Sequence, residues 1–413
     1  MRLIYDLGIR IYYFLIQIAS LSNPKAKQWI KGRRGLFRRI SREVDPTEPL
    51  IWFHCSSLGE FEQGRPVIEQ IRREKPDKKI LLTFYSPSGY EIRKNYEGAD
   101  HIFYLPLDTR RNAKLFLDLM NIEQAFFVKY EFWYNFLSAL QRRKIPVYLV
   151  SGIFRENQAF FKWYGSWYRK ILSMFEHLFL QEESSLELLN SIGLKHTSVN
   201  GDTRFDRVYE IAQRVSADER FRTFCQNSTT IIAGSTWPAD EEILVRYINE
   251  SENECKWIIA PHEIHESGVG RLAGEIHKKT QRYTMLKENE LENTDVIIID
   301  TIGILSSLYQ YAQVAYIGGG FGRGIHNTLE AATFGNPILF GPEYHKFKEA
   351  CDLVSRKAGF PVSSYTEFKS TLDGLLNDNV LLRNSGNASE MYVKSMIGAS
   401  SRIVDFALKS NAD

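Results

Sequence analysis

The sequence lacks several features that mark whole classes of protein. Its four cysteines are widely separated and form no CxxC pair, no zinc-ligand spacing and no disulfide framework. Such cysteine use suits a reducing cytosol. The formal net charge is only +2, which argues against bulk binding of nucleic acid. No low-complexity tract and no short repeat is present.

Metal-ligand spacing is also missing. His262 and His265 lie three residues apart, but we find no ligand set completed around them, so non-metal roles are favoured. The chain has 413 residues, 44% of them apolar and 25% charged. This length and composition fit a folded protein of two ordinary domains.

From residue 50 on, short apolar runs rich in β-branched and aromatic residues alternate with helix-like stretches. This rhythm predicts an α/β fold with parallel sheets. It pauses near residues 201–214 and then resumes, so we place a boundary near residues 206–218 and expect two doubly wound, Rossmann-like domains facing a central cleft. The expected strands are residues 50–54, 80–85, 125–128, 147–150, 178–180, 231–233, 257–260, 296–299, 314–317 and 338–340. The expected parts are an N-terminal segment (1–45), a first domain (46–210) and a second domain (211–413).

Residues 3–21 are strongly apolar and, as a helix, would be roughly 28 Å long, close to the apolar thickness of a bilayer. Asp6, Arg10 and Gln17 interrupt this stretch and fall on one narrow stripe, with Asp6 and Arg10 paired one turn apart. The stripe favours a helix that lies in the membrane interface or docks on the protein, rather than one that spans the bilayer.

Eight basic residues follow, a density that favours an anionic, cytoplasmic lipid surface. They are Lys25, Lys27, Lys31, Arg33, Arg34, Arg38, Arg39 and Arg42. The alternative is an ordinary buried helix followed by a solvated basic loop.

The run from Gly318 to Gly324 is the most informative motif. The apolar strand at 314–317 enters these glycines, and a helix is expected from residues 326–327 to about Gly335. Glycines let backbone N–H groups approach a phosphate, and a helix start adds free donors and partial positive charge. Glu330 could then accept hydrogen bonds from the two hydroxyls of a ribose. The alternative is structural, because Asn327-x-x-Glu330 is also a capping box.

Further polar residues follow other predicted strands. Glu60 comes after the first strand and could act as a general base, for which burial should raise its pKa. Ser57-x-x-Glu60 also fits a capping box, which is the alternative role. The segment from Lys129 to Asn135 combines charged and aromatic groups that suit a sugar or an anionic acceptor, or else a helix start with a buried tryptophan.

The second half repeats this pattern at its own strand ends. The triplet Gly234-Ser235-Thr236 could bind a phosphate, or form a plain turn with a cap. His262 could meet a phosphate or hydrogen-bond within the fold. The segment from Asp300 to Leu305 is equally ambiguous.

The order of these motifs resembles the 3-deoxy-D-manno-octulosonic acid (Kdo) transferases of lipopolysaccharide synthesis. The matching segments, spread over nearly the whole chain, are Ser57–Glu60, Glu131–Asn135, Gly201–Asp206, Gly234–Thr236, Asp300–Gly303, Gly319–Glu330 and Gly341–Pro342.

The resemblance implies a GT-B fold and an inverting, metal-independent transfer without a cofactor, from the donor CMP-Kdo to a lipid A precursor (lipid IVA). It implies a place on the cytoplasmic side of the inner membrane, reached through the N-terminus. The first domain would bind the acceptor and the second the donor. Glu60 would be the general base. The donor-binding residues would be Gly234, Ser235, Thr236, His262, Gly303, Gly319, Gly320, Asn327 and Glu330. The acceptor-binding residues would be Ser57, Lys129, Glu131 and Arg155.

Three other functions are compatible with the sequence. The protein could be a GT-B transferase that uses a UDP-sugar, a hexosamine 2-epimerase with the same two-domain cleft, or a non-catalytic membrane protein that binds a nucleotide-sugar or lipid. An epimerase would leave the apolar N-terminus and the basic cluster unexplained. The chain also departs from the family pattern at Pro261, Ile302, Ile304, Ile325, Lys129 and Tyr134.

Overall fold

The computed structural model describes residues 1–409. The chain forms two compact units, and the path crosses between them twice. The first unit holds Met1–Arg207 together with the segment from Ile397 on, and the second holds Val208–Met396.

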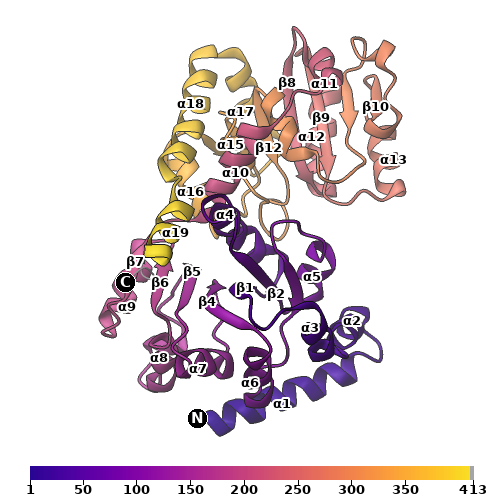
Figure 1. Cartoon of the computed structure of the whole chain (residues 1–413). Coiled ribbons are helices and arrows are strands. Elements are labelled where there is room, and N and C mark those ends of the chain that lie inside the picture. The colour runs from indigo at the N-terminus through magenta and orange to yellow at the C-terminus, as the bar shows by residue number, and fades with distance from the viewer. Residues whose placement is uncertain (410–413) are drawn as a thin grey trace. The chain divides into compact units, whose positions relative to one another are not determined.

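The first unit is built on a parallel sheet of seven strands in the order β3-β2-β1-β4-β5-β6-β7 (Figure 1). Its strands are β1 (Pro49–Cys55), β2 (Lys79–Phe84), β3 (His101–Tyr104), β4 (Asn121–Val128), β5 (Val147–Gly152), β6 (His177–Leu180) and β7 (Thr197–Val199). Successive side chains of a strand point to opposite faces. Trp52 and Phe53 accordingly pack into different core clusters, so both faces of the sheet are covered.

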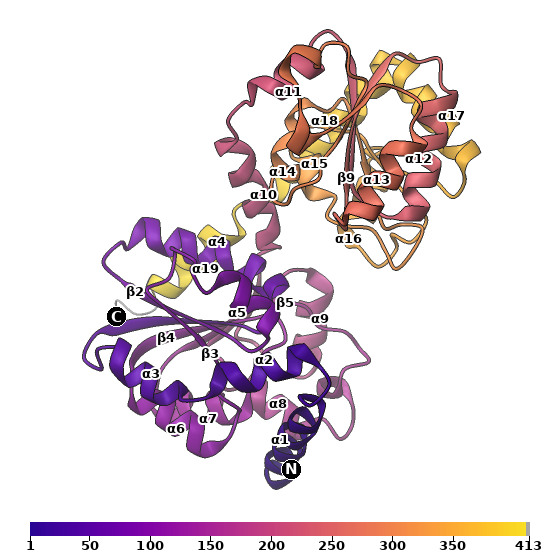
Figure 2. The same cartoon turned by 90° about the vertical axis from the view of Figure 1, so that its right-hand side faces the viewer.

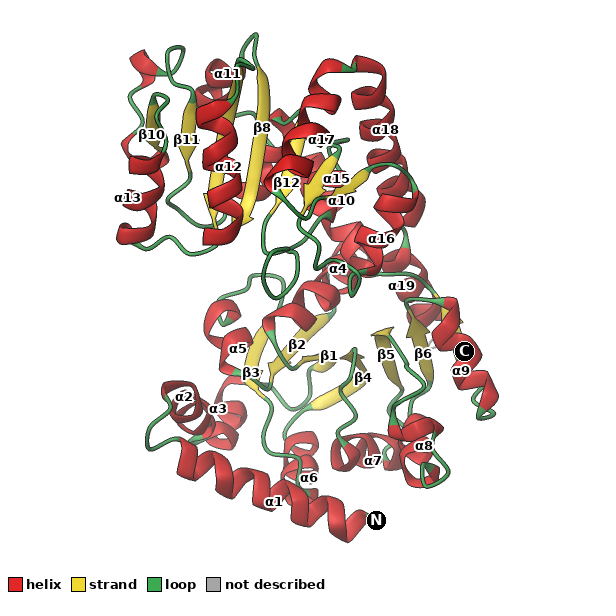
Figure 3. Cartoon of the chain, turned by 180° about the vertical axis from the view of Figure 1, so that it is seen from behind, coloured by secondary structure: helices red, strands yellow, loops and turns green. Residues whose placement is uncertain are grey.

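Buried apolar side chains of α4 and α19 pack on one face of the sheet, and those of α2, α3, α6, α7, α8 and α9 pack on the other. Figure 3 shows α4 and α19 on the opposite side of the strands from α6 and α7. The helices of this unit are α1 (Arg2–Ala19), α2 (Pro24–Arg33), α3 (Leu36–Glu43), α4 (Leu58–Glu74), α5 (Pro87–Arg93), α6 (Arg110–Asp118), α7 (Tyr134–Arg142), α8 (Ser166–Leu172), α9 (Glu183–Ser191) and α19 (Ala399–Lys409), with the 3-10 helix η1 (Ala159–Phe161). Helix α10 (Thr203–Arg214) carries the chain into the second unit.

The C-terminal helix belongs to the first unit, whereas the sequence placed residues 211–413 together. Ile403, Val404 and Ala407 of α19 are buried in the same core cluster as Ile68 of α4. The carboxylate of Asp206 fixes the start of α19, because it accepts hydrogen bonds from the backbone N–H of Ser400 at 2.7 Å and its hydroxyl at 2.6 Å.

The second unit also contains a parallel sheet of seven strands, in the order β10-β11-β9-β8-β12-β13-β14 (Figure 3). Figure 2 shows β9 of this sheet with helices α12 and α13 to one side of it and α14 and α15 to the other. Its strands are β8 (Thr229–Thr236), β9 (Cys255–Pro261), β10 (Thr280–Arg282), β11 (Val296–Ile298), β12 (Val314–Ile317), β13 (Ile338–Phe340) and β14 (Gly359–Pro361). Its helices are α11 (Glu219–Cys225), α12 (Pro238–Glu250), α13 (Glu266–Glu275), α14 (Leu305–Leu308), α15 (Leu329–Ala332), α16 (Lys348–Ser355), α17 (Tyr365–Asn377) and α18 (Asn379–Met396), with η2 (Tyr283–Met285), η3 (Glu288–Glu290) and η4 (Tyr309–Tyr311).

All ten strands expected from the sequence are present, and β3, β7, β10 and β14 were not predicted. In each sheet the first strand along the chain lies in the interior. β1 lies between β2 and β4, and β8 lies between β9 and β12. The strand order therefore reverses direction at β1/β4 and at β8/β12. Ligands of open α/β sheets bind beyond the carboxyl ends of the strands at such switch points.

Candidate active site

The switch point of the first sheet gathers two of the predicted acidic residues. β1 and β4 pair in parallel register as far as His54 opposite Phe127. Glu60 follows β1, and Glu131 follows β4. The two segments that carry these carboxylates are distant in sequence but leave adjacent strands at the same edge of the sheet.

Glu60 lies in the first turn of α4 and is half-buried. Its carboxylate accepts a hydrogen bond from the backbone N–H of Ser57 at 2.7 Å and another from the Ser57 hydroxyl at 3.2 Å. The capping box that was the alternative role of Glu60 is therefore present, with Ser57 as its partner. Burial and the charge of Glu131 nevertheless raise the pKa of Glu60, the direction that favours proton abstraction.

Glu131 is buried, with 6% of its surface exposed. Its Oε2 atom lies 3.1 Å from Nε2 of His54, accepts a hydrogen bond from the Ser56 hydroxyl at 2.9 Å, and accepts another from the indole N–H of Trp133. His54 is itself held by Thr83, whose hydroxyl lies 2.9 Å from Nδ1. The His54, Ser56 and Trp133 groups all contact Oε2 of this carboxylate, and its contact with an acceptor stays a prediction.

Lys129, Tyr130 and Arg155 extend the same edge. Lys129 directly follows β4 and has a left-handed backbone (φ 63°), which is unusual for a residue with a side chain. Burial raises the pKa of the Tyr130 hydroxyl, the Arg155 guanidinium lowers it, and the charge of Glu60 raises it further. Tyr130 therefore lies within electrostatic reach of both Glu60 and the exposed Arg155.

The switch point of the second sheet brings the two glycine motifs into contact. β8 and β12 pair in register as far as Gly234 opposite Ile317. The N–H of Gly318 donates to the carbonyl of Gly234 at 2.9 Å. A Cβ atom on Gly318 would lie 2.3 Å from the carbonyl oxygen of Ser235. Ser235 has a left-handed backbone (φ 55°), at the irregularity in the pairing of β8 with β9.

Several predicted phosphate donors already have partners in the fold. The Thr236 hydroxyl is buried and donates to Glu241 at 3.2 Å. The N–H of Gly319 donates to the buried carboxylate of Asp240 at 2.8 Å. Gly320 packs against the backbone of Gly341, where a Cβ atom would approach within 2.5 Å. Close backbone packing thus accounts for these glycines, and Gly319 and Thr236 do not offer these groups to a ligand.

The helix after the glycine loop is shorter than predicted, because α15 spans only Leu329–Ala332. Asn327 donates from its side chain to Glu330 at 3.0 Å and accepts from the N–H of Leu329 at 3.1 Å. The other carboxylate oxygen of Glu330 accepts a hydrogen bond from Ser306. Gly303, with φ 99°, lies in the loop before α14. Asn327 and Glu330 therefore form a local polar cluster next to the glycine loop.

A cavity of about 480 Å³ lies directly on the glycine loop. It is lined by Trp237, Pro238, Ala239, Asp240, Gly319, Phe321, Gly322, Arg323, Gly324 and His326. Of the predicted donor-binding residues only Gly319 lines it. Arg323 is exposed, and Trp237 is 36% exposed. An aromatic face beside a cation can bind a planar or anionic ligand group.

Three rings stack beside this cavity. The centroid of the His262 ring lies 4.6 Å from that of Trp237 and 4.4 Å from that of His326. The indole N–H of Trp237 donates to His326 Nε2 at 3.0 Å. Burial and the neighbouring His262 lower the pKa of His326, which favours the neutral ring.

Trp237, Arg323 and His326 were not predicted as site residues. Trp237 directly follows the Gly-Ser-Thr triplet, and Arg323 stands between two glycines of the loop. Trp237 and Arg323 could have been predicted from these neighbours in the sequence. Within residues 1–409, no group of three or more histidine, cysteine, aspartate or glutamate side chains is arranged to hold a metal ion.

Helix α1 docks on the first unit through its polar side. The Tyr5 hydroxyl donates to Asp108, and the side chain of Asn135 donates to Asp6 at 2.9 Å. Asp6 pairs with Arg2 at 3.8 Å. It does not pair with Arg10 as predicted, and Arg10 is exposed. The docked alternative thus explains Asp6.

The opposite side of α1 carries an apolar stripe in which every side chain is at least 50% exposed. The residues of this α1 stripe are Leu3, Ile4, Leu7, Ile11, Phe14, Leu15 and Ile18. Among the described helices, none is both long enough and apolar enough to cross a bilayer. The exposed stripe is the pattern of a helix that lies along an apolar surface.

Two of the eight basic residues serve the fold instead of the surface. The Arg33 guanidinium donates to the carbonyls of Tyr85 at 2.7 Å, Leu105 at 2.8 Å and Trp29 at 3.2 Å, and burial lowers its pKa to about 10. Arg39 packs over the ring of Phe103 at 5.5 Å. The exposed basic residues of this segment are Lys25, Lys27, Lys31, Arg34, Arg38 and Arg42.

Comparison with known proteins places this architecture in a family. A sequence model described as 3-Deoxy-D-manno-octulosonic-acid transferase (kdotransferase) matches residues 28–207. The 3-deoxy-D-manno-octulosonic acid transferase of Aquifex aeolicus is 30% identical over 336 residues, which cover 79% of this chain and 86% of that protein. The enzyme of the same name from Rickettsia bellii is 26% identical over 394 residues, covering 92% and 91% of the two chains. That from Haemophilus influenzae is 24% identical over 407 residues, covering 94% and 93%.

Solved structures show the same fold at low identity. UDP-GlcNAc 2-epimerase from Neisseria meningitidis has a TM-score of 0.59 at 16% identity and covers 88% of this chain and 100% of its own. MurG from Acinetobacter baumannii has a TM-score of 0.54 at 12% identity and covers 88% and 99%. At such identities the likeness concerns the fold alone. The extent and identity of the Aquifex match show that the chain belongs to the 3-deoxy-D-manno-octulosonic acid transferase family.

Proposed function

We propose that the protein is an inverting glycosyltransferase that moves Kdo from CMP-Kdo to a lipid A precursor such as lipid IVA. Family membership supports Kdo transfer. The observation that supports the chemistry is the half-buried Glu60 at the switch point of the first sheet, with a pKa raised by burial and by Glu131. A carboxylate in this environment is a stronger base than an exposed one and is still accessible to an acceptor hydroxyl.

In the proposed reaction, Glu60 takes the proton of the acceptor hydroxyl while the hydroxyl oxygen attacks the anomeric carbon of Kdo. The bond between that carbon and the phosphate oxygen of CMP breaks, and CMP leaves with the electron pair. Ser57 orients the Glu60 carboxylate through its backbone N–H. Glu131, held in place by His54 and Trp133, acts on Glu60 through its charge.

The donor would bind in the second unit at the β8/β12 switch point. The cavity on the glycine loop offers Arg323 for negative charge and Trp237 for ring stacking. In this proposal the electrostatic environment of the cavity stabilises the negative charge that develops on CMP as it leaves, and no metal ion takes part. The two α/β units, each with one such switch point, support the GT-B fold that we propose for the chain.

The acceptor is a membrane lipid, and the N-terminal segment suits such a substrate. The α1 stripe can insert among lipid tails, while the exposed basic residues of α2 and α3 attract anionic headgroups. We therefore propose attachment to the cytoplasmic face of the inner membrane through the N-terminus.

The test is incubation of the protein with CMP-Kdo generated in place and a tetra-acylated lipid A precursor, followed by mass spectrometry. An acceptor heavier by one or more Kdo residues is expected. Calorimetry with CMP and with UDP separates the alternatives. Preference for UDP would favour a UDP-sugar enzyme, and CMP binding without any transfer would favour a non-catalytic role.

A further inference from the structure

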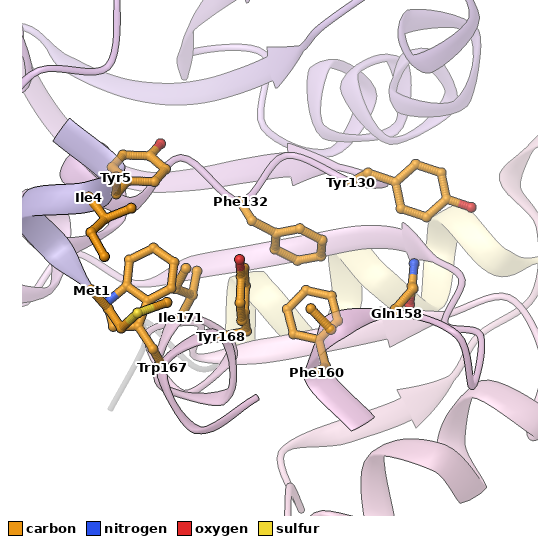
Figure 4. Close-up of a pocket in the computed structure, with 11 residues that line it drawn as sticks. Met1, Ile4, Tyr5, Tyr130, Phe132, Gln158, Phe160, Trp167, Tyr168 and Ile171 are labelled. Carbon is orange, nitrogen blue, oxygen red and sulfur yellow. The ribbon is translucent and has the colours of Figure 1, made fainter. Parts of the chain in front are cut away.

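The first unit contains a second cavity, of about 550 Å³, away from the carboxylate pair and lined almost entirely by apolar and aromatic groups (Figure 4). Its walls come from α1, the loop after β4, the η1 region and α8. They are formed by Met1, Ile4, Tyr5, Tyr130, Phe132, Gln158, Ala159, Phe160, Trp167, Tyr168 and Ile171. Its size lies within the range of about 300–1,000 Å³ found for ligand sites.

Ring contacts hold these walls in place. The centroids of Phe132 and Phe160 lie 5.1 Å apart in a T-shaped arrangement, and Phe160 lies 6.1 Å from Tyr168. Tyr5 lies 5.7 Å from Trp167. The Tyr5 hydroxyl is tied to the buried Asp108, which fixes α1 as one wall. The cavity is therefore built by packed side chains.

The two ends of the cavity differ in chemistry. Met1, Ile4, Tyr5 and Trp167 gather at one end in Figure 4, and Ile4 belongs to the exposed α1 stripe. Tyr130 and Gln158 lie at the other end. Tyr130 is 42% exposed and senses the charges of Glu60 and Arg155. An apolar ligand inside would thus run from a lipid-facing helix towards the candidate base.

We propose that this cavity holds one acyl chain of the acceptor glycolipid, with the chain end towards α1 and the sugar headgroup beyond Tyr130 at Glu60. This inference rests on the proposed function and adds a substrate-specificity site to it. Burial of the chain contributes binding free energy remote from the reacting atoms, and it sets the position of the hydroxyl relative to Glu60. Arg155 stands at the headgroup end, where an anionic substituent of the glycolipid would be met.

Kinetics with acceptors of graded acyl length, kept in detergent-free solution below their critical micelle concentration, test the proposal. KM for the acceptor should fall by about fourfold for each methylene group added, until the chain fills the cavity. The variant Ala159→Trp fills the cavity with an indole ring. It should raise KM for the long-chain acceptor at least tenfold and remove the dependence on chain length, with KM for CMP-Kdo unchanged.

Asn157→Trp is the matched control, because it adds the same ring two residues away at an exposed position that does not line the cavity. It should behave like the wild type. Equal KM values for the two variants would overturn the proposal. An outcome in which the wild type transfers Kdo to no acceptor would instead refute the proposed function.

A second measurement uses the wild-type protein and does not depend on a variant that folds. An acceptor with a photoreactive diazirine at the end of one acyl chain should label peptides that contain Trp167, Tyr168 or residues 1–5. Labelling elsewhere contradicts the assignment. Complete loss of labelling in excess phospholipid of equal chain length would make this a general lipid site and would overturn the assignment to the acceptor.

Discussion

Glu131 lies buried beside Glu60, and its negative charge raises the pKa of that half-buried carboxylate. The two residues follow adjacent strands, Glu60 in the first turn of α4 and Glu131 after β4, and Glu60 is the more accessible of the two. His54, Ser56 and Trp133 hold Glu131 in place. A fixed, buried charge can therefore tune the basicity of a half-buried neighbour without contacting the substrate.

The first prediction concerns this coupling. Glu131→Gln removes the charge that raises the pKa of Glu60, so the pKa of Glu60 should fall. Glu60 then stays deprotonated at lower pH, and the acid limb of the profile of kcat/KM against pH should shift to lower pH. The plateau rate should also fall, because a less basic carboxylate abstracts a proton less readily. Glu156→Gln, at an exposed loop position, is the control. An acid limb that stays in place in Glu131→Gln would show that the charge of Glu131 does not raise the pKa of Glu60.

The second prediction concerns the cavity on the glycine loop. Arg323→Gln and Trp237→Leu should each weaken CMP binding by roughly tenfold, since each removes a contact of about 1–2 kcal/mol. Isothermal titration calorimetry with CMP measures this loss. Arg383→Gln, at an exposed position of α18, serves as control. Unchanged CMP affinity in both site variants would show that the donor binds elsewhere.

The third prediction concerns the α1 stripe. The double substitution Leu7→Asp and Phe14→Asp should reduce partition into vesicles of anionic lipid by at least about 100-fold, because each buried apolar side chain contributes about 1.5–3 kcal/mol. Tyr5 and Asp6 are untouched, so the helix should remain docked. Gln17→Asp adds a charge at an exposed position outside the stripe and should have a small effect. Cosedimentation shows the difference, and equal partition of both proteins would place the membrane contact elsewhere.

The fourth prediction concerns stability. Arg33→Lys keeps the charge but loses the planar group that reaches the carbonyls of Trp29, Tyr85 and Leu105. The free energy of unfolding of the first unit should fall by about 2 kcal/mol. Arg34→Lys changes the exposed neighbour and should leave stability unchanged. Hydrogen exchange of amides in β2 and β3 resolves this unit from the other. Equal hydrogen-exchange protection of these amides in Arg33→Lys and Arg34→Lys would mean that the contacts of Arg33 contribute no more to stability than those of an exposed arginine.

The sequence predicted the interior of both sheets and missed their edges. Interior strands are covered on both faces and contain continuous apolar runs, such as residues 50–53 of β1 and 125–128 of β4. The four strands that were not predicted are the edge strands of the two sheets, β3, β7, β10 and β14. They are only partly buried, and each contains a polar residue, a glycine or a proline, so none reads as an uninterrupted apolar strand.

The parts of the site that depend on residues close together in the sequence were predictable. Glu60 directly follows a strand, and its capping interaction with Ser57 is local. The burial of Glu131 was not predictable, because its partner His54 belongs to another strand. The helix expected after the glycine loop is short because the N–H groups of Gly324 and His326 bond back to Gly319 and Gly318. The stacking of His262 on Trp237 likewise depends on tertiary contacts.

The measurement closest to the central claim is the turnover of Glu60→Gln in the mass-spectrometric assay, beside Glu62→Gln on the same helix. The folded-state pKa of Glu60 is raised, so its charge opposes folding as pH rises, and the amide should not destabilise the protein at neutral pH. We expect kcat to fall at least about 100-fold in Glu60→Gln, with CMP affinity unchanged, and to stay near the wild-type value in Glu62→Gln. Near-normal Kdo transfer by a folded Glu60→Gln protein would contradict the account.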